Sequence, residues 1–188
     1  MTMDLTPTPS QTAGPFLHLG LTDTRSVACI AGHGTKGERV QLKFRLLDGD
    51  GLPVPDAMIE LWQANSEGNY KETDANAGGT FFGFGRLATS EEGTCTFETI
   101  KPGRVPGPGG TLQAPHINVS VFARGLLKRL STRVYFAGDP ANAEDFVLGL
   151  VPAPRHATLL ALPDTVRDGS WAHEIRMRGE GETVFFDV

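Results

Sequence analysis

Apolar and polar residues alternate in several short segments of the chain. In residues 40–46 every second side chain is apolar, and polar ones stand between them. Residues 116–122 repeat the pattern, with three β-branched apolar residues on one face and polar residues on the other. A period of two residues is typical of a half-buried β-strand. We therefore predict strands in these two segments, with further strands at 57–63, 94–100, 130–136, 172–178 and 183–188.

Turn-forming residues separate the predicted strands. Asp-Gly-Asp-Gly follows the first strand, and Gly-Glu-Gly at 179–181 precedes the last one. Asp139 and Pro140 are suited to begin a short helix over 141–148. The first twenty residues are rich in Pro, Thr and Gly, which favours an extended arm rather than a helix. The pattern predicts an all-β fold: one domain over residues 1–188, a β-sandwich of mainly antiparallel strands with one or two short helices and an extended N-terminal arm of about twenty residues.

Composition and charge narrow the functional classes. The net charge of −5 is not that of a nucleic-acid-binding surface. Two cysteines, Cys29 and Cys95, are too few for a disulfide framework in 188 residues, so we expect free thiols. The chain starts without a basic and apolar leader, and no apolar run approaches the length of a membrane span. These features favour a cytoplasmic protein without a membrane or nucleic-acid partner.

Four motifs, taken in order, resemble one enzyme family. They are QTAGPF at 11–16, LWQAN at 61–65, TIKPG at 99–103 and PHIN at 115–118. Their order and spacing resemble the intradiol dioxygenases, β-sandwich enzymes that open catechols between the two hydroxyls. The closing string RGEGETVFFD at 178–187 is similar to the α-type chain of the two-chain members, whose partner β subunit carries the iron.

This resemblance implies a role for the chain in a complex. It implies a non-iron-binding α subunit of an α/β hetero-oligomer that cleaves 3,4-dihydroxybenzoate with O2 to 3-carboxy-cis,cis-muconate. Fe(3+) would be bound by the partner β chain and not by this one. The chain would shape the cleft of its partner and help to build the assembly.

The histidine ligands of the catalytic members are incomplete in this sequence. Those members hold ferric ion with two tyrosinates and a His-x-His pair, whose members share one face of a strand. The corresponding pair here is His116 and Asn118. The neutral amide of Asn118 is a poor replacement for an imidazole.

The tyrosine ligands are missing as well. One tyrosine would fall two residues after Lys-Pro-Gly, where this chain has Val105. The other would fall between Tyr70 and Gly85, near three phenylalanines, in a stretch without tyrosine. The only tyrosines, Tyr70 and Tyr135, stand where the family has tyrosines that do not bind iron. We expect no metal site in this chain.

The resemblance points to four residues that would contribute to the cleft of the partner. Thr12, Gly14 and Pro15 belong to an arm that resembles a segment approaching that cleft, although an ordinary turn in a docked arm remains an alternative. Arg133 shares a strand face with Tyr135 and is suited to meet an anionic ligand; the alternative is an interfacial salt bridge with the β chain.

Two rival functions remain to be compared. An intradiol enzyme active on its own requires the two tyrosines and the His-x-His pair that this sequence lacks. A stand-alone prealbumin-like β-sandwich binding module, without a catalytic partner, would be monomeric when purified alone. An α-type subunit would instead expose a large apolar patch in the absence of its partner.

Overall fold

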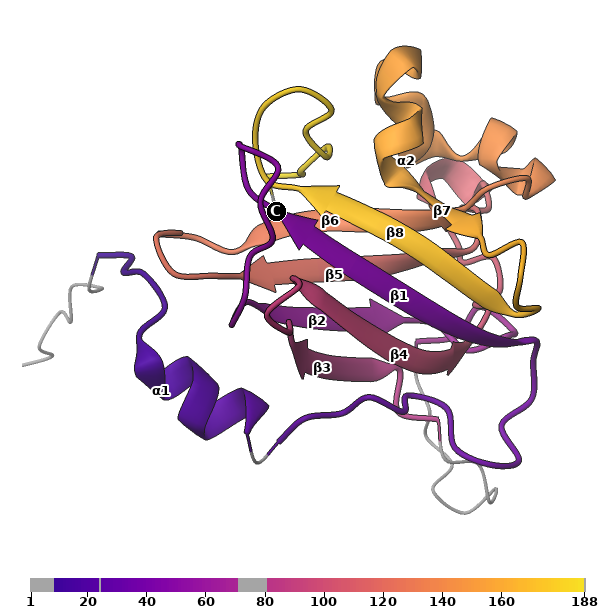
Figure 1. Cartoon of the computed structure of the whole chain (residues 1–188). Coiled ribbons are helices and arrows are strands. Elements are labelled where there is room, and N and C mark those ends of the chain that lie inside the picture. Colours follow the sequence, from indigo (N-terminus) through magenta and orange to yellow (C-terminus); the bar gives the residue numbers. More distant parts are fainter. Residues whose placement is uncertain (1–8, 24, 71–80, 188) are drawn as a thin grey trace, which may run out of the picture.

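The computed structural model describes residues 9–23, 25–70 and 81–187 (Figure 1). These residues form mainly strands, with a few short helical segments between them. The strands are β1 (Arg39–Leu47), β2 (Met58–Gln63), β3 (Phe84–Ala88), β4 (Thr94–Ile100), β5 (His116–Phe122), β6 (Leu130–Phe136), β7 (Leu160–Pro163) and β8 (Ser170–Arg176). The helical segments are α1 (Pro15–Leu17), η1 (His18–Thr22), η2 (Pro108–Gly110), η3 (Pro140–Glu144), α2 (Phe146–Gly149) and η4 (Ala153–Leu159). Within the described ranges no helix is long and apolar enough to cross a membrane.

The strands are hydrogen-bonded in the order β3-β2-β5-β6-β7-β8-β1-β4. Among the described strands, β1 with β8 and β6 with β7 are parallel, and the other neighbouring pairs are antiparallel. The short β7 joins the half that contains β5 to the half that contains β1 (Figure 1). The prediction of an all-β fold with few helices is confirmed. Its finer form, a two-layer sandwich, stays a prediction, because β7 makes one sheet of the two halves.

Alternating side chains build the core between the two halves. Leu42 and Phe44 of β1 and Val119 of β5 are fully or almost fully buried in one cluster. Phe44 meets Phe97 of β4 edge to face, with 5.9 Å between the ring centroids. Aromatic pairs in this arrangement add to the stabilisation from burial alone. The alternation in the sequence therefore predicted correctly which faces point inward.

Several predicted elements differ from those observed. Strands β3 and β7 were not predicted, because β3 has a single buried position and β7 has four residues. The strand predicted at 183–188 is wrong: in the described residues Phe186 forms only an isolated bridge with Ser131. The predicted helix at 141–148 is divided into η3 and α2, because extended backbone at Asp145 separates them.

The extended arm is wrong from Pro15 onward. Residues 15–22 form a short helical turn, α1, followed by a π-helical turn, η1. The amide of Leu17 donates to the carbonyl of Gly14 at 3.0 Å. Proline is favourable at the first helical position because it has no N–H to leave unpaired. Figure 1 shows this segment projecting beside the sheet rather than packed on its face.

The expectation of free thiols is confirmed for both cysteines, with Cys95 buried and Cys29 exposed. The neighbouring residues Gln63 and Trp62 at the end of β2 lie in different environments. Gln63 is fully buried, and its amide donates to the carbonyl of Ile100 at 2.9 Å. Trp62 is instead 44% exposed, and its ring stacks on that of Tyr70 with 6.1 Å between the ring centroids.

Candidate functional site

The loop that follows β2 docks tightly on the loop that follows β4. The amide of Gly103 donates to the carbonyl of Asn65 at 2.8 Å. Gly68 has a φ of +83°, and a Cβ there would lie 2.0 Å from the carbonyl oxygen of Arg104. Only glycine fits so close an approach with a positive φ. The contact brings the segment that carries Tyr70 next to the segment that carries Val105.

Tyr70, His116 and Asn118 form one hydrogen-bonded cluster at the start of β5. The Tyr70 hydroxyl lies 3.3 Å from Nε2 of His116 and accepts from Nδ2 of Asn118 at 3.2 Å. Nδ1 of His116 lies 2.8 Å from the carbonyl of Ala114. A carbonyl only accepts, so Nδ1 carries the proton and Nε2 accepts from the phenol. The side chains at the two positions that correspond to the histidine pair are thus both hydrogen-bonded within the chain.

Burial keeps the His116 ring neutral. The exposed fraction of His116 is 2%, and desolvation together with the positive charge of Arg133 lowers its pKa to about 4. Tyr135 lies beside it, with 5.8 Å between ring centroids. Burial raises the pKa of the Tyr135 phenol above its ordinary value, so this group is un-ionised near neutral pH.

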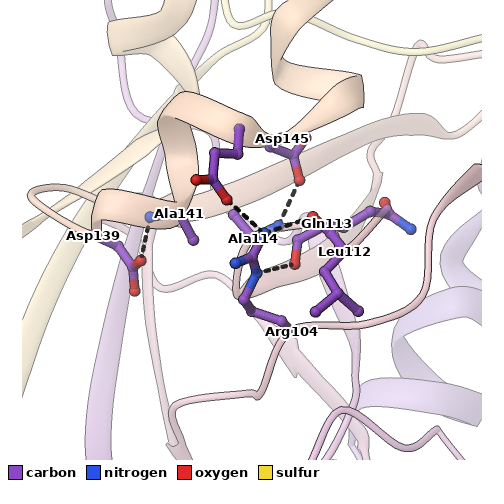
Figure 2. A network of polar contacts seen from close by, with 8 residues as sticks. Arg104, Leu112, Gln113, Ala114, Asp139, Ala141 and Asp145 are labelled. Atoms are coloured by element: carbon purple, nitrogen blue, oxygen red, sulfur yellow. Dashed lines mark hydrogen bonds and ion pairs between the residues drawn. The ribbon is translucent and has the colours of Figure 1, made fainter. Parts of the chain in front are cut away.

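A buried carboxylate fixes the segment that leads into β5. Figure 2 shows Asp145 accepting a hydrogen bond from the amide of Ala114, at 2.7 Å. Its other oxygen accepts from the Leu148 amide at 2.7 Å and from the Tyr135 hydroxyl at 3.1 Å. Asp145 is therefore both the N-cap of α2 and the brace of the β5 segment. In the same network Arg104 donates to the carbonyl of Leu112 at 2.9 Å (Figure 2).

Arg133 lies on β6 directly opposite Asn118 of β5. Its Nη1 donates to Oε1 of Gln113 at 2.7 Å. As predicted, it shares a face with Tyr135, because Val134 points the other way into the core. Arg133 and Asn118 line a surface pocket of about 460 Å³.

The described residues at the ligand positions do not fit a ferric ion. Val105 is buried and offers no donor atom. Asn118 presents an N–H group to the phenol of Tyr70, and its amide brings no negative charge. Residues 71–80, which include much of the predicted stretch of the second tyrosine, lie outside the described ranges. In the ranges that are described, no three His, Cys, Asp or Glu side chains form a group that could hold a metal.

The arm residues lie away from this cluster. The Thr12 hydroxyl accepts from the Gly125 amide at 2.7 Å, beyond the far end of β5. Gly14 lines a separate pocket of about 430 Å³ with Asp56 and Arg124. Pro15 begins α1. In the single chain, the pocket lined by Arg133 therefore includes none of Thr12, Gly14 and Pro15.

A family model described as Dioxygenase matches residues 12–179. The protocatechuate 3,4-dioxygenase alpha chain of Pseudomonas putida is 43% identical over the full length of both chains. This chain belongs to the intradiol dioxygenase family. A further relative in the family, the protocatechuate 3,4-dioxygenase beta chain of Burkholderia cepacia, is 36% identical over 78% of this chain and 67% of its own length. The fold agrees with family membership: the dioxygenase domain of a carbohydrate-binding fusion protein from Streptomyces sp. SirexAA-E covers 93% of this chain and 99% of its own, with a TM-score of 0.64 at 24% identity.

Sequence reasoning missed two parts of this intradiol dioxygenase site. The bracing role of Asp145 has no local signal, because its partner Ala114 is distant in the chain. The sequence indicates that Tyr70 is not an iron ligand, but it gives no sign that the phenol bonds both His116 and Asn118. Pairs this far apart in sequence become visible only when the strands are in register.

Proposed function

We propose that this chain is the iron-free α-type subunit of a two-chain ferric dioxygenase. The complex cleaves protocatechuate (3,4-dihydroxybenzoate) with O2 to 3-carboxy-cis,cis-muconate. The partner β chain holds the Fe(3+), and the present chain closes the cleft of that partner and contributes to the assembly. Membership of the dioxygenase family supports the proposed reaction, and full-length similarity to an alpha chain supports the assignment to this subunit.

One observation carries the proposal. The imidazole of His116 is fully engaged between Ala114 and Tyr70, and an amide stands where a second imidazole is required. Val105 replaces a phenolate with a hydrocarbon side chain. Ferric ion is a hard cation that needs anionic oxygen donors. A chain of this family that lacks these iron ligands contributes to catalysis through a partner chain that binds the iron.

The test is co-expression with a β chain, such as the protocatechuate 3,4-dioxygenase beta chain of Burkholderia cepacia. Ferric content, visible tyrosinate-to-iron absorption and oxygen uptake with protocatechuate are measured for each chain alone and for the co-purified complex. We expect colour and turnover in the complex and neither from this chain alone. Colour and turnover from this chain alone would overturn the proposal.

The arm is proposed to reach the cleft of the partner through Thr12, Gly14 and Pro15. Gly14 offers a clean test, because a Cβ there would meet no atom of the described residues within 4 Å. Gly14→Val should therefore leave the stability of this chain unchanged. In the complex we expect a raised KM for protocatechuate with unchanged iron content. An unchanged KM would remove the arm from the cleft and leave the subunit assignment intact.

Arg133 is proposed as the fourth contributor to ligand binding in the complex. Its position in a surface pocket, with no carboxylate partner among the described residues, supports contact with an anion from outside the chain. A stand-alone prealbumin-like module remains the rival function. Size-exclusion chromatography of the mixed chains distinguishes the two, because a module of that kind would elute as the same monomer with and without the β chain.

A further inference from the structure

Gln113 connects the loop that carries Val105 to the guanidinium of Arg133. Its Oε1 atom accepts from Nη1 of Arg133 at 2.7 Å, and its Nε2 atom donates to the carbonyl of Pro106 at 3.0 Å. Because a guanidinium only donates and a carbonyl only accepts, this orientation of the amide is the one that satisfies both contacts. The backbone N–H of Gln113 also donates to the carbonyl of Val105 at 2.8 Å. The side-chain oxygen is thus presented to the arginine from an anchored residue.

The backbone that carries Gln113 is held on both sides. Pro106 and Leu112 form an antiparallel bridge, which makes a short hairpin of the preceding loop. Arg104 donates to the carbonyls of Leu112 at 2.9 Å and of Gln113 at 3.4 Å. The next residue, Ala114, is bound by a buried carboxylate in the same network (Figure 2). Gln113 therefore projects from a fixed support, which is what a residue needs if it is to orient another side chain.

Arg133 depends on such a contact for its orientation. The β5–β6 ladder fixes its backbone opposite Asn118, but its long side chain has many rotamers. No Asp or Glu in the described ranges forms an ion pair with it. A neutral amide oxygen takes up one N–H of the guanidinium without cancelling the charge, so the group stays able to bind an anion.

We propose that Gln113 is a positioning residue for Arg133. Its Oε1 atom holds the guanidinium in the orientation in which it meets the carboxylate of protocatechuate in the cleft of the partner. The inference rests on the proposed function, in which Arg133 contributes to ligand binding, and it assigns Gln113 no contact with the substrate. An arginine that is already held in place loses less conformational freedom when the ligand binds, so the affinity rises.

The experiment uses the co-purified complex with Gln113→Leu and Arg133→Gln, alone and combined. Leucine is similar in size to glutamine but offers no acceptor. Gln41→Leu is the matched control, because Gln41 of β1 also accepts from an arginine, Arg167, at 3.2 Å. Oxygen uptake gives kcat and KM for protocatechuate. Competitive inhibition compares 4-hydroxybenzoate with its neutral analogue 4-hydroxybenzamide, and the visible absorption of the iron reports that the complex is intact.

Gln113→Leu should raise KM for protocatechuate about 3- to 10-fold, the effect of one side chain that is no longer held in place, with kcat and iron content unchanged. Inhibition by 4-hydroxybenzoate should weaken in parallel, and inhibition by 4-hydroxybenzamide should change little. Arg133→Gln should raise KM at least about 10-fold, because it removes a charge-assisted contact. Adding Gln113→Leu to Arg133→Gln should have no further effect, since both act through one guanidinium.

If Gln113→Leu does not assemble with the β chain, Gln113→Glu replaces it. This variant keeps an acceptor for Arg133 but compensates its charge, so inhibition by 4-hydroxybenzoate should weaken at least as much. Inhibition equal to that of the unsubstituted complex would overturn the inference.

Two results with Gln113→Leu would also overturn the inference and leave the role of Arg133 intact. One is a KM equal to that of Gln41→Leu while Arg133→Gln raises KM. The other is a combined variant in which the two effects multiply, because the residues would then act independently. An unchanged KM in Arg133→Gln would refute the role proposed for Arg133 itself, and the inference with it.

Discussion

The buried carboxylate of Asp145 should be the most sensitive polar position near the site. It is 3% exposed and accepts three hydrogen bonds, from the Ala114 amide, the Leu148 amide and the Tyr135 hydroxyl. Replacement by Ala leaves these three donors without an acceptor. An unpaired buried donor costs about 1–3 kcal/mol. Asp145→Ala should thus lower the free energy of unfolding by at least about 3 kcal/mol, the sum of the smallest costs for three donors and a large part of the total for a domain.

Two further variants test the reasoning. Asp145→Asn keeps one acceptor oxygen but turns an N–H₂ group toward one of the donors, so we expect a loss of about 1–3 kcal/mol. Glu144→Ala is the matched control: its carboxylate is 71% exposed and pairs with Arg104 at 3.2 Å. Such a surface pair contributes at most about 1 kcal/mol. Urea unfolding followed by tryptophan fluorescence measures all three. The reasoning is refuted if Asp145→Ala costs no more than Glu144→Ala.

Three further predictions concern acid stability, loop docking and thiol reactivity. Burial lowers the pKa of His116 and His173 from the usual 6.5 to about 4. Between these two pH values the unfolded state therefore binds more protons than the folded state. The free energy of unfolding should fall as the pH drops from about 6.5 to 4, by up to about 1.4 kcal/mol per pH unit for each ring. Urea midpoints that do not change between pH 7 and 5 would contradict this. Gly68→Ala should cost more than about 3 kcal/mol by urea unfolding, because its Cβ would meet the Arg104 carbonyl, whereas Gly125→Ala, at a similar φ with no described atom within 4 Å, should cost about 1 kcal/mol; equal losses would argue against the steric explanation. Burial raises the pKa of the Cys95 thiol to about 12, so a thiol reagent should modify one cysteine quickly in the native chain and Cys95 only after unfolding; rapid loss of both thiols would show that Cys95 is accessible.

Regular alternation made much of the sheet predictable. Strand β5 has exactly the predicted limits because its apolar residues line the core at every second position. Strand β3 escaped prediction for a physical reason: only Gly85 is buried there, packed beneath Ile30 and Phe97, so no hydrophobic period exists. The apolar residues near the C-terminus do not form the predicted strand, and Phe186 instead lines the pocket beside Arg133.

The candidate site was predictable only in part. The identities at 105, 116 and 118 could be interpreted from motif resemblance, and the structure places His116 and Asn118 in contact with Tyr70. Nothing in the sequence marks Asp145 as the brace of Ala114, because that bond depends on how α2 packs beside β5. The pocket lined by Arg133 and Asn118 likewise depends on the register that sets these two residues opposite each other.

The iron stoichiometry of the co-purified complex tests the central claim most directly. Total iron and the amount of each chain are measured in the same active preparation. We predict one ferric ion for each pair of chains, all of it retained by the β chain after the two are separated. Two ferric ions per pair, or iron that remains with this chain after separation, would contradict the account.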